Sequence, residues 1–215
     1  MIKKNKWKLL LSSLIILLPI LFGLIFWNKL PEQMVTHWGA DGKANGWSNR
    51  SFAVFAVPFF ILAVHWFCIL CTLKDPKNSD QSNKIFRILL WICPITSLVA
   101  SGMIYAAALG KALEATGIVY LLVGVLFIII GNYLPKCRQN HTIGIRVKWT
   151  IENEENWNAT HRFSGKVWTI GGVLMMVCAF LPEQISLYVF LVLVIGLSVI
   201  STGYSYYYFK RMQSR

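Results

Sequence analysis

Charged residues are scarce in this sequence: they make up 14% of the 215 residues, whereas 56% are hydrophobic. Soluble domains usually contain about a quarter charged residues. The hydrophobic residues fall in uninterrupted blocks, several of them long enough, at roughly 18 residues or more, to indicate membrane-spanning helices. These blocks exclude intrinsic disorder. They do not alternate polar and apolar positions, which excludes a transmembrane β-barrel.

Acidic residues are missing from the apolar blocks altogether, because all nine of them lie between or outside the blocks. Ionisable side chains at membrane depth usually mark ion or proton pathways. His65 is the one such group well inside a block, and a single histidine there is more typical of a packed or hydrogen-bonded residue. A proton-coupled transporter is therefore disfavoured.

The five cysteines do not indicate a structural disulfide, because four lie in apolar blocks and Cys137 lies in a basic connection. Cys68 and Cys71 form a C-x-x-C pair inside a block, where cysteine as a small hydrophobic residue is the default interpretation. The sequence also lacks the H-E-x-x-H and G-x-S-x-G patterns. It predicts no enzyme, with no catalytic residues, no metal and no cofactor.

Six apolar segments are present, and they predict an all-α, polytopic membrane protein with six transmembrane helices. The segments cover about residues 9–27, 52–73, 88–109, 117–134, 167–181 and 185–209. The fifth is short for a span, so we expect its helix to begin earlier, near Ser164. We expect the first to remain as an anchor, because its apolar run is longer than a signal-peptide core and no cleavage site follows it.

Lysine and arginine are distributed unevenly over the ends and connections. The N-terminus, the second and fourth connections and the C-terminal tail hold 17 of them, and the other connections hold 4. Because cytoplasmic loops are enriched in these residues, we predict that both termini face the cytoplasm. This asymmetry explains most of the net charge of +12, so the charge does not indicate that the protein binds nucleic acid directly.

Glycines recur every seven residues at Gly110, Gly117, Gly124 and Gly131, and again at Gly196 and Gly203. Small residues on one helical stripe allow neighbouring backbones to approach closely. We expect this stripe to pack inside the bundle, and a homodimer contact is the alternative.

The first connection, about residues 28–51, is predicted to face outward. Its Asp-Gly and Asn-Gly dipeptides favour tight turns, and the sequence from Met34 to Trp38 could form an extended arm. His37, Trp38 and Trp47 form either an interfacial anchor or a surface for an external, partly apolar ligand.

The fourth connection, about residues 135–166, is predicted to face the cytoplasm. Thr150 is a candidate N-cap, and the acidic residues after it suit a helix N-terminus. Trp157, His161 and Ser164 would then share one face of a short helix at the membrane surface that leads into the fifth span. His141, His161 and Cys137 do not form a known catalytic pattern.

Two motifs in these connections resemble a known family. The Leu30-Pro31 and Thr36-His37-Trp38 sequences with the turn at 42–47 resemble a domain of unknown function at the start of SdpI-type proteins. The fourth connection resembles the SdpI signature itself, through Asn132, Pro135, Gly144, Arg146, Trp149, Thr150, Trp157, Thr160, His161, Arg162 and Gly165. The family usually shows Thr-Pro where this chain has Val147-Lys148.

The resemblance divides the chain into four parts. Residues 1–51 contain the first span and the outer loop, 52–130 contain spans two to four, 131–166 form the signature loop, and 167–215 contain the last two spans and a basic tail. It implies a multi-pass immunity protein of the bacterial plasma membrane that protects the cell from a secreted, membrane-active killing peptide.

The same resemblance implies, for some members, a second role in which the toxin-occupied protein holds a winged-helix autorepressor at the membrane. We expect His37, Trp38 and Trp47 to face the toxin and the eleven signature residues to face a cytoplasmic partner. A transporter for a small molecule or peptide is the alternative, and a membrane enzyme is a more distant one.

Overall fold

The computed structural model describes residues 2–39, 41–77, 83–111 and 115–214. The chain forms two compact units, one made of Met1–Lys74 with Phe86–Ala115 and the other of Asp75–Ile85 with Thr116–Arg215. Six helices in the described residues are long and apolar enough to cross a membrane, as the sequence predicts. They cover Asn5–Ile25, Phe52–Lys74, Phe86–Ala108, Thr116–Lys136, Glu154–Phe180 and Ile185–Gln213.

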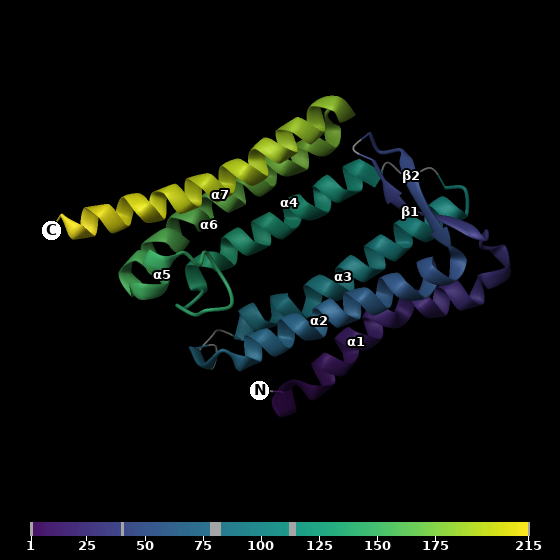
Figure 1. Cartoon of the computed structure of the whole chain (residues 1–215), viewed down its shortest axis with the longest axis horizontal. Coiled ribbons are helices and arrows are strands. Elements are labelled where there is room, and N and C mark those ends of the chain that lie inside the picture. Colours follow the sequence, from purple (N-terminus) through teal and green to yellow (C-terminus); the bar gives the residue numbers. More distant parts are fainter. Residues whose placement is uncertain (1, 40, 78–82, 112–114, 215) are drawn as a thin grey trace. The chain divides into compact units, whose positions relative to one another are not determined.

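The first unit consists of three long helices and a β-hairpin (Figure 1). Helix α1 (Ile2–Ile25) ends in a short 3-10 turn (Trp27–Lys29), and strands β1 (Gln33–Trp38) and β2 (Ala44–Asn49) follow. A π-helical turn (Phe52–Ala56) leads into α2 (Val57–Lys74), and α3 (Asn83–Ala108), from Phe86 onward, completes the unit. The predicted extended arm is therefore one strand of an antiparallel hairpin, which is a small addition to an otherwise all-α chain.

Polar side chains join the helices of this unit where the packing is tightest. Ser97 of α3 donates a hydrogen bond to the carbonyl of Ile16 at 2.8 Å, and the Tyr105 hydroxyl donates to the carbonyl of Pro19 at 2.8 Å. The His65 ring is fully buried, with Nε2 3.0 Å from the Ser12 hydroxyl. These contacts place the polar groups between helices, where lipid cannot reach them.

The second unit consists of α4 (Ala115–Tyr133), α5 (Lys148–Glu152), α6 (Glu154–Val177) and α7 (Glu183–Gln213), with 3-10 turns at Leu134–Lys136 and Cys178–Phe180. Helices α6 and α7 pack along each other. The Phe163 and Tyr204 rings stack with centroids 4.0 Å apart, and the Trp168 Nε1–H donates to the Ser201 hydroxyl at 3.0 Å.

Two local expectations for the signature loop are wrong. Thr150 does not cap the helix that crosses the membrane, because it lies inside the short helix α5, and Asn153 caps α6 by accepting from the N–H of Asn156 at 2.8 Å. The expected surface helix is not separate from the fifth span. Helix α6 runs without a break from Glu154 to Val177, because no proline interrupts it.

The glycine stripe packs inside the second unit at two of its positions. A Cβ on Gly124 would lie 2.7 Å from the carbonyl oxygen of Gly172, and one on Gly131 would lie 2.7 Å from that of Gly165. The heptad spacing thus brings α4 against the backbone of α6, as expected for close helix packing. A Cβ on Gly196 or Gly203 of α7 would meet no neighbouring atom within 4 Å among the described residues.

The two sets of glycines should respond oppositely to alanine. We expect Gly124→Ala to lower the melting temperature of the purified protein in detergent, because overpacking costs about 1–3 kcal/mol. Gly196→Ala is the matched control, and we expect it to leave the melting temperature unchanged or to raise it, because alanine favours the helix by roughly 0.5–1 kcal/mol. Equal melting temperatures for the two variants would contradict the assigned α4–α6 contact.

Candidate functional site

The hairpin of the first unit presents one polar face and buries the other. Its turn is closed by Gly42, whose φ of +69° favours glycine, and by the Asp41 carboxylate, which accepts from the N–H of Lys43 at 3.2 Å. On the buried face, Met34 packs into a hydrophobic core with Leu30 and Val54. Across the strands, the Thr36 and Ser48 hydroxyls lie 2.9 Å apart.

The structure divides the three predicted outer contact residues between these faces. His37 and Trp47 lie on the exposed face, where Trp47 is 57% exposed and His37 Nδ1 lies 2.6 Å from the Asn45 side-chain oxygen. Trp38 lies on the opposite face and packs, half-buried, against the core. The exposed face therefore combines an indole, an imidazole and an amide, whereas Trp38 supports it from behind.

Arg50 fixes the hairpin to the end of α1, although it was not among the residues predicted from the sequence. Its guanidinium donates to the carbonyls of Trp27 at 2.7 Å and Leu30 at 3.0 Å, and it lies 4.5 Å from the centroid of the Trp27 ring. Its backbone N–H donates to the carbonyl of Glu32 at 2.8 Å. A planar group with several donors suits this role, but a lone arginine after a turn gives no sequence signal for it.

The signature loop of the second unit is irregular, and buried side chains take the place of the missing helical hydrogen bonds. Asn140 is fully buried. Its amide nitrogen donates to the carbonyls of Arg138 and Ile143 at 2.8 and 2.9 Å, and its oxygen accepts from the N–H groups of Thr142 and Ile143 at 2.7 and 2.6 Å. Asn140 thus holds this turn closed, and it too was absent from the residues predicted from the sequence.

Thr150 performs the same task further along the loop. Its hydroxyl accepts from the N–H of Val147 at 3.0 Å and donates to the carbonyl of Ile145 at 2.8 Å. These bonds start α5 although Val147 at the N-cap has no polar side chain, because the capping oxygen comes from Thr150.

Trp157 and His161 lie one turn apart on α6, and the irregular part of the signature loop folds against their side chains. Their rings stack with centroids 4.0 Å apart, and the Trp157 Nε1–H donates to the carbonyl of Cys137 at 2.8 Å. His161 Nε2 accepts from the N–H of Ile145 at 3.0 Å, and Nδ1 donates to the carbonyl of Trp157 at 2.8 Å. One nitrogen must carry a proton and the other must lack one, so the ring is neutral and its tautomer is fixed.

Gly144 allows the loop to approach these rings. Its φ is +111°, and a Cβ there would lie 3.2 Å from the Trp157 ring and would clash with His161 Nε2. Glycine is required both for this backbone conformation and for the lack of space.

A second buried network joins the start of α6 to α7. Asn156 donates to the carbonyl of Ser205 at 3.0 Å, and its side-chain oxygen accepts from the hydroxyls of Thr160 and Ser205, both at 2.9 Å. All three side chains are buried. Gly165 lies further along α6, where a Cβ would lie 2.7 Å from the Pro135 ring.

Asp75, directly after α2, contacts the signature loop. Its carboxylate accepts from the N–H of His141 at 2.7 Å, the hydroxyl of Thr142 at 2.8 Å and the N–H of Lys77 at 3.1 Å. Burial raises the pKa of this carboxyl, but these hydrogen bonds, together with the nearby His141 charge, outweigh burial and hold the pKa below its ordinary value.

Ten of the eleven predicted signature residues fall into a buried and an exposed group of five each, and Trp149 lies between them. The buried group builds the loop: Thr150, Trp157, Thr160, His161 and Gly165. Asn132, Pro135, Gly144, Arg146 and Arg162 are exposed, and Trp149 is half-buried against the Tyr206 and Phe209 rings of α7. A partner could touch the exposed group alone, and that role remains a prediction.

The chemistry of the loop offers no activated nucleophile at Cys137. Burial raises the pKa of its thiol, a hydrogen bond from Asn140 lowers it, and the result is a pKa of about 11. The thiol is protonated at neutral pH and is a poor nucleophile in that form. Among the described residues, no three histidine, cysteine or acidic side chains form a group that could hold a metal ion.

Comparison with known proteins connects both regions to one family. Residues 14–62 match a domain of unknown function, DUF1648, and residues 136–205 match the SdpI/YfhL protein family. Immunity protein SdpI of Bacillus subtilis (strain 168) is 30% identical over 215 residues, which is 98% of both chains. The chain belongs to the SdpI/YfhL protein family. The resemblance found in the sequence is confirmed over nearly the whole length.

The SdpI match contains the loop, α6 and most of α7, whereas Asn132 and Pro135 lie just before it. The DUF1648 match contains the whole hairpin. No solved structure matches the chain.

Two indole N–H groups of the SdpI region provide a matched test of the loop geometry. We expect Trp157→Phe to destabilise the protein by about 1–3 kcal/mol, because it leaves the buried Cys137 carbonyl unpaired. Trp149→Phe makes the same chemical change at an indole N–H that has no hydrogen-bond partner among the described residues. We therefore expect it to lower the free energy of unfolding only slightly. Thermal unfolding in detergent measures both, and a larger loss for Trp149→Phe would contradict the assigned contacts.

Proposed function

We propose that this chain protects its cell from a secreted, membrane-active killing peptide and that it does so by binding the peptide. The relationship to an immunity protein over 98% of both chains carries this proposal. The chain is also a multi-pass membrane protein, which is where a membrane-active peptide must be met. An immunity family favours a binding protein over an enzyme.

The exposed face of the hairpin is the proposed contact for the peptide. The Trp47 indole supplies a rigid apolar surface, and His37 with Asn45 supplies hydrogen-bonding groups beside it. Tryptophan is frequent among residues that dominate binding energy, because it buries a large area at little cost in conformational entropy. The core contacts of Trp38 and the clamp made by Arg50 hold this face in place before the peptide arrives.

No observation on the described residues favours the transport or enzyme alternatives. The cytoplasmic autorepressor implied for some family members remains a prediction, and the exposed Arg146 is the residue we would test first for that contact.

The proposal requires the hairpin to face the outside and both termini to face the cytoplasm, which the 17-to-4 distribution of basic residues supports. In a variant without the five native cysteines, we expect Lys43→Cys to react with a membrane-impermeant maleimide in intact cells. Ser214→Cys should react only after lysis. The reverse pattern would place the hairpin inside and would refute the proposed contact.

Survival of toxin-sensitive cells tests the binding face directly. The cells would express this chain and be challenged with the killing peptide from its own genomic neighbourhood. We expect His37→Ala and Trp47→Ala each to reduce the protective effect about tenfold or more, because central contact residues contribute roughly 1.4 kcal/mol or more.

Lys43→Ala is the control, because Lys43 lies beside the turn and, among the described residues, its hydrogen bonds are made by its backbone. All variants are compared at equal abundance in the membrane. Full protection by both His37→Ala and Trp47→Ala would refute the hairpin contact, and no protection by the wild-type chain against an active peptide would refute the immunity proposal.

A further inference from the structure

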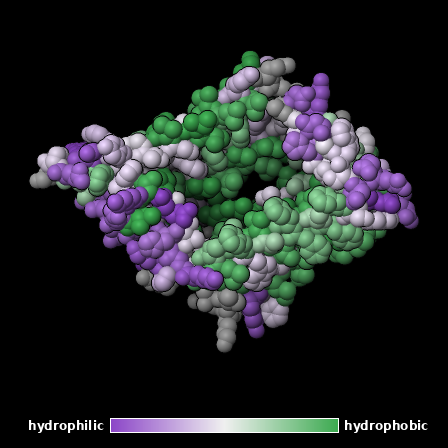
Figure 2. All heavy atoms as spheres, in the orientation of Figure 1, coloured by the Kyte–Doolittle hydropathy of each residue, from purple (hydrophilic) through white to green (hydrophobic). Residues whose placement is uncertain are grey.

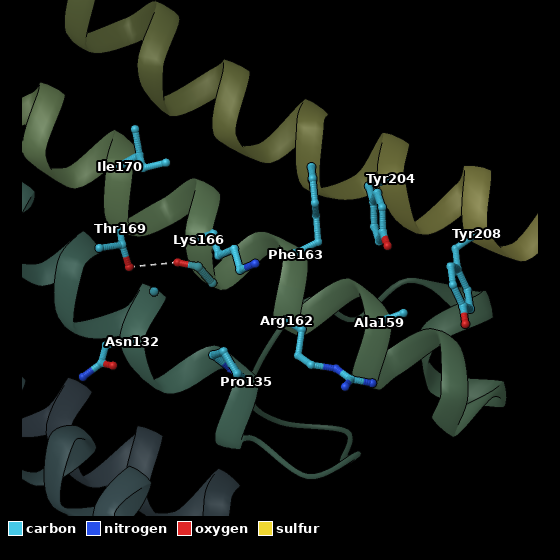
Figure 3. Close-up of a pocket in the computed structure, with 12 residues that line it drawn as sticks. Asn132, Pro135, Ala159, Arg162, Phe163, Lys166, Thr169, Ile170, Tyr204 and Tyr208 are labelled. Atoms are coloured by element: carbon cyan, nitrogen blue, oxygen red, sulfur yellow. Dashed lines mark hydrogen bonds between the residues drawn. The ribbon is translucent and has the colours of Figure 1, made fainter.

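An open groove of about 950 Å³ lies in the second unit, between the end of α4, the middle of α6 and the last turns of α7. Figure 3 shows Arg162 and Lys166 of α6 between Pro135 at the end of α4 and Tyr204 of α7. Buried contacts of α6 fix the position of the two other helices that line the groove. Gly165 packs against Pro135 at the end of α4, and Asn156 donates a hydrogen bond to α7.

The groove is positively charged. Arg162 and Lys166 are one helical turn apart, both side chains are exposed, and no aspartate or glutamate lines the groove among the described residues. Arg162 Nε makes a long contact of 3.3 Å with the carbonyl of Asn158 in its own helix, which leaves the other guanidinium N–H groups available. Within the part of the chain that the structure describes, neither cation has a carboxylate partner. Two cations in one groove favour an anionic ligand.

One end of the groove is apolar. Ile170, one turn beyond Lys166, is 63% exposed, and the stacked Phe163 and Tyr204 rings line the groove on the side of Arg162 (Figure 3). The residues of α6 change from polar to apolar at the same point, because Lys166 is the last charged residue before an apolar run. Figure 2 shows hydrophilic residues gathered over α5 and the start of α6, with hydrophobic residues along the helices beyond. This change from charged to apolar residues along α6 suits a bilayer headgroup beside the cations and an acyl chain beside Ile170.

We propose that this groove binds an anionic phospholipid, with its phosphate between Arg162 and Lys166 and an acyl chain against Ile170. A soluble phosphate would use the cations but not the apolar end, so the lipid accounts for both features. Basic pockets between membrane helices are suited to such headgroups. The site goes beyond the proposed immunity function, because it involves neither the hairpin nor the killing peptide.

Native mass spectrometry of the full chain, released from detergent, tests the proposal. The probes are phosphatidylglycerol and phosphatidylcholine with the same acyl chains. We expect preferential retention of phosphatidylglycerol and about a twenty-five-fold weaker retention after Arg162→Gln with Lys166→Gln, since each of the two basic groups near a headgroup contributes roughly fivefold. Ala159→Trp, which fills the groove without changing charge, should weaken retention as well.

Lys210→Gln with Arg211→Gln is the matched control, because it removes two exposed cations from the last turn of α7, outside the groove. Circular dichroism checks that each variant keeps its helices. Equal retention of both lipids, or an equal loss in the control, would overturn the proposal. Displacement of the lipid by millimolar glycerol phosphate would show a site for free phosphate and would also overturn it. The survival assay does not enter this test, so the two proposals can fail independently.

Discussion

The hydrocarbon core of a bilayer offers no hydrogen-bonding partner to a polypeptide backbone, and this constraint governs the rest of the structure. A helix satisfies most of its backbone hydrogen bonds internally, and the six long apolar segments are all helices. Several polar side chains within the spans turn inward, as Ser97 and Tyr105 do toward backbone carbonyls of α1. In the described residues, irregular backbone lies at the ends of the helices, and many of the candidate functional residues are found at or near those ends.

At those ends, side chains replace the hydrogen bonds that a helix would have supplied. Arg50 satisfies two carbonyls after α1, and Asn140 satisfies both donors and acceptors in the signature loop. His161 accepts from Ile145 and requires a neutral ring to do so. These groups are rigid because leaving any of them unpaired is costly, and rigidity lets the nearby exposed side chains form surfaces of fixed shape.

The buried signature residues and the exposed ones therefore have different tasks. Trp157, Thr160 and Asn156 build the junction of the loop with α6 and α7. Arg162 and Lys166 then project from α6 beside that junction, in the groove that we assign to an anionic lipid. The hairpin follows the same plan, since Trp38 and Arg50 support it and Trp47 and His37 remain available for contact.

The sequence by itself determined the membrane class, the six spans and the family, because long apolar runs and local motifs are properties of consecutive residues. It also indicated the tight turns of the hairpin through Asp-Gly and Asn-Gly. It could not decide that α6 begins at Glu154 or that Asn153, and not Thr150, caps it, because several polar residues there compete for the same role.

Only the tertiary structure separated Trp38 from Trp47 and the buried signature residues from the exposed ones, since each distinction depends on what packs against the side chain. Arg50 and Asn140 were missed for the same reason. Their partners are backbone carbonyls and N–H groups, which nearly every residue type provides and which leave no trace in the sequence.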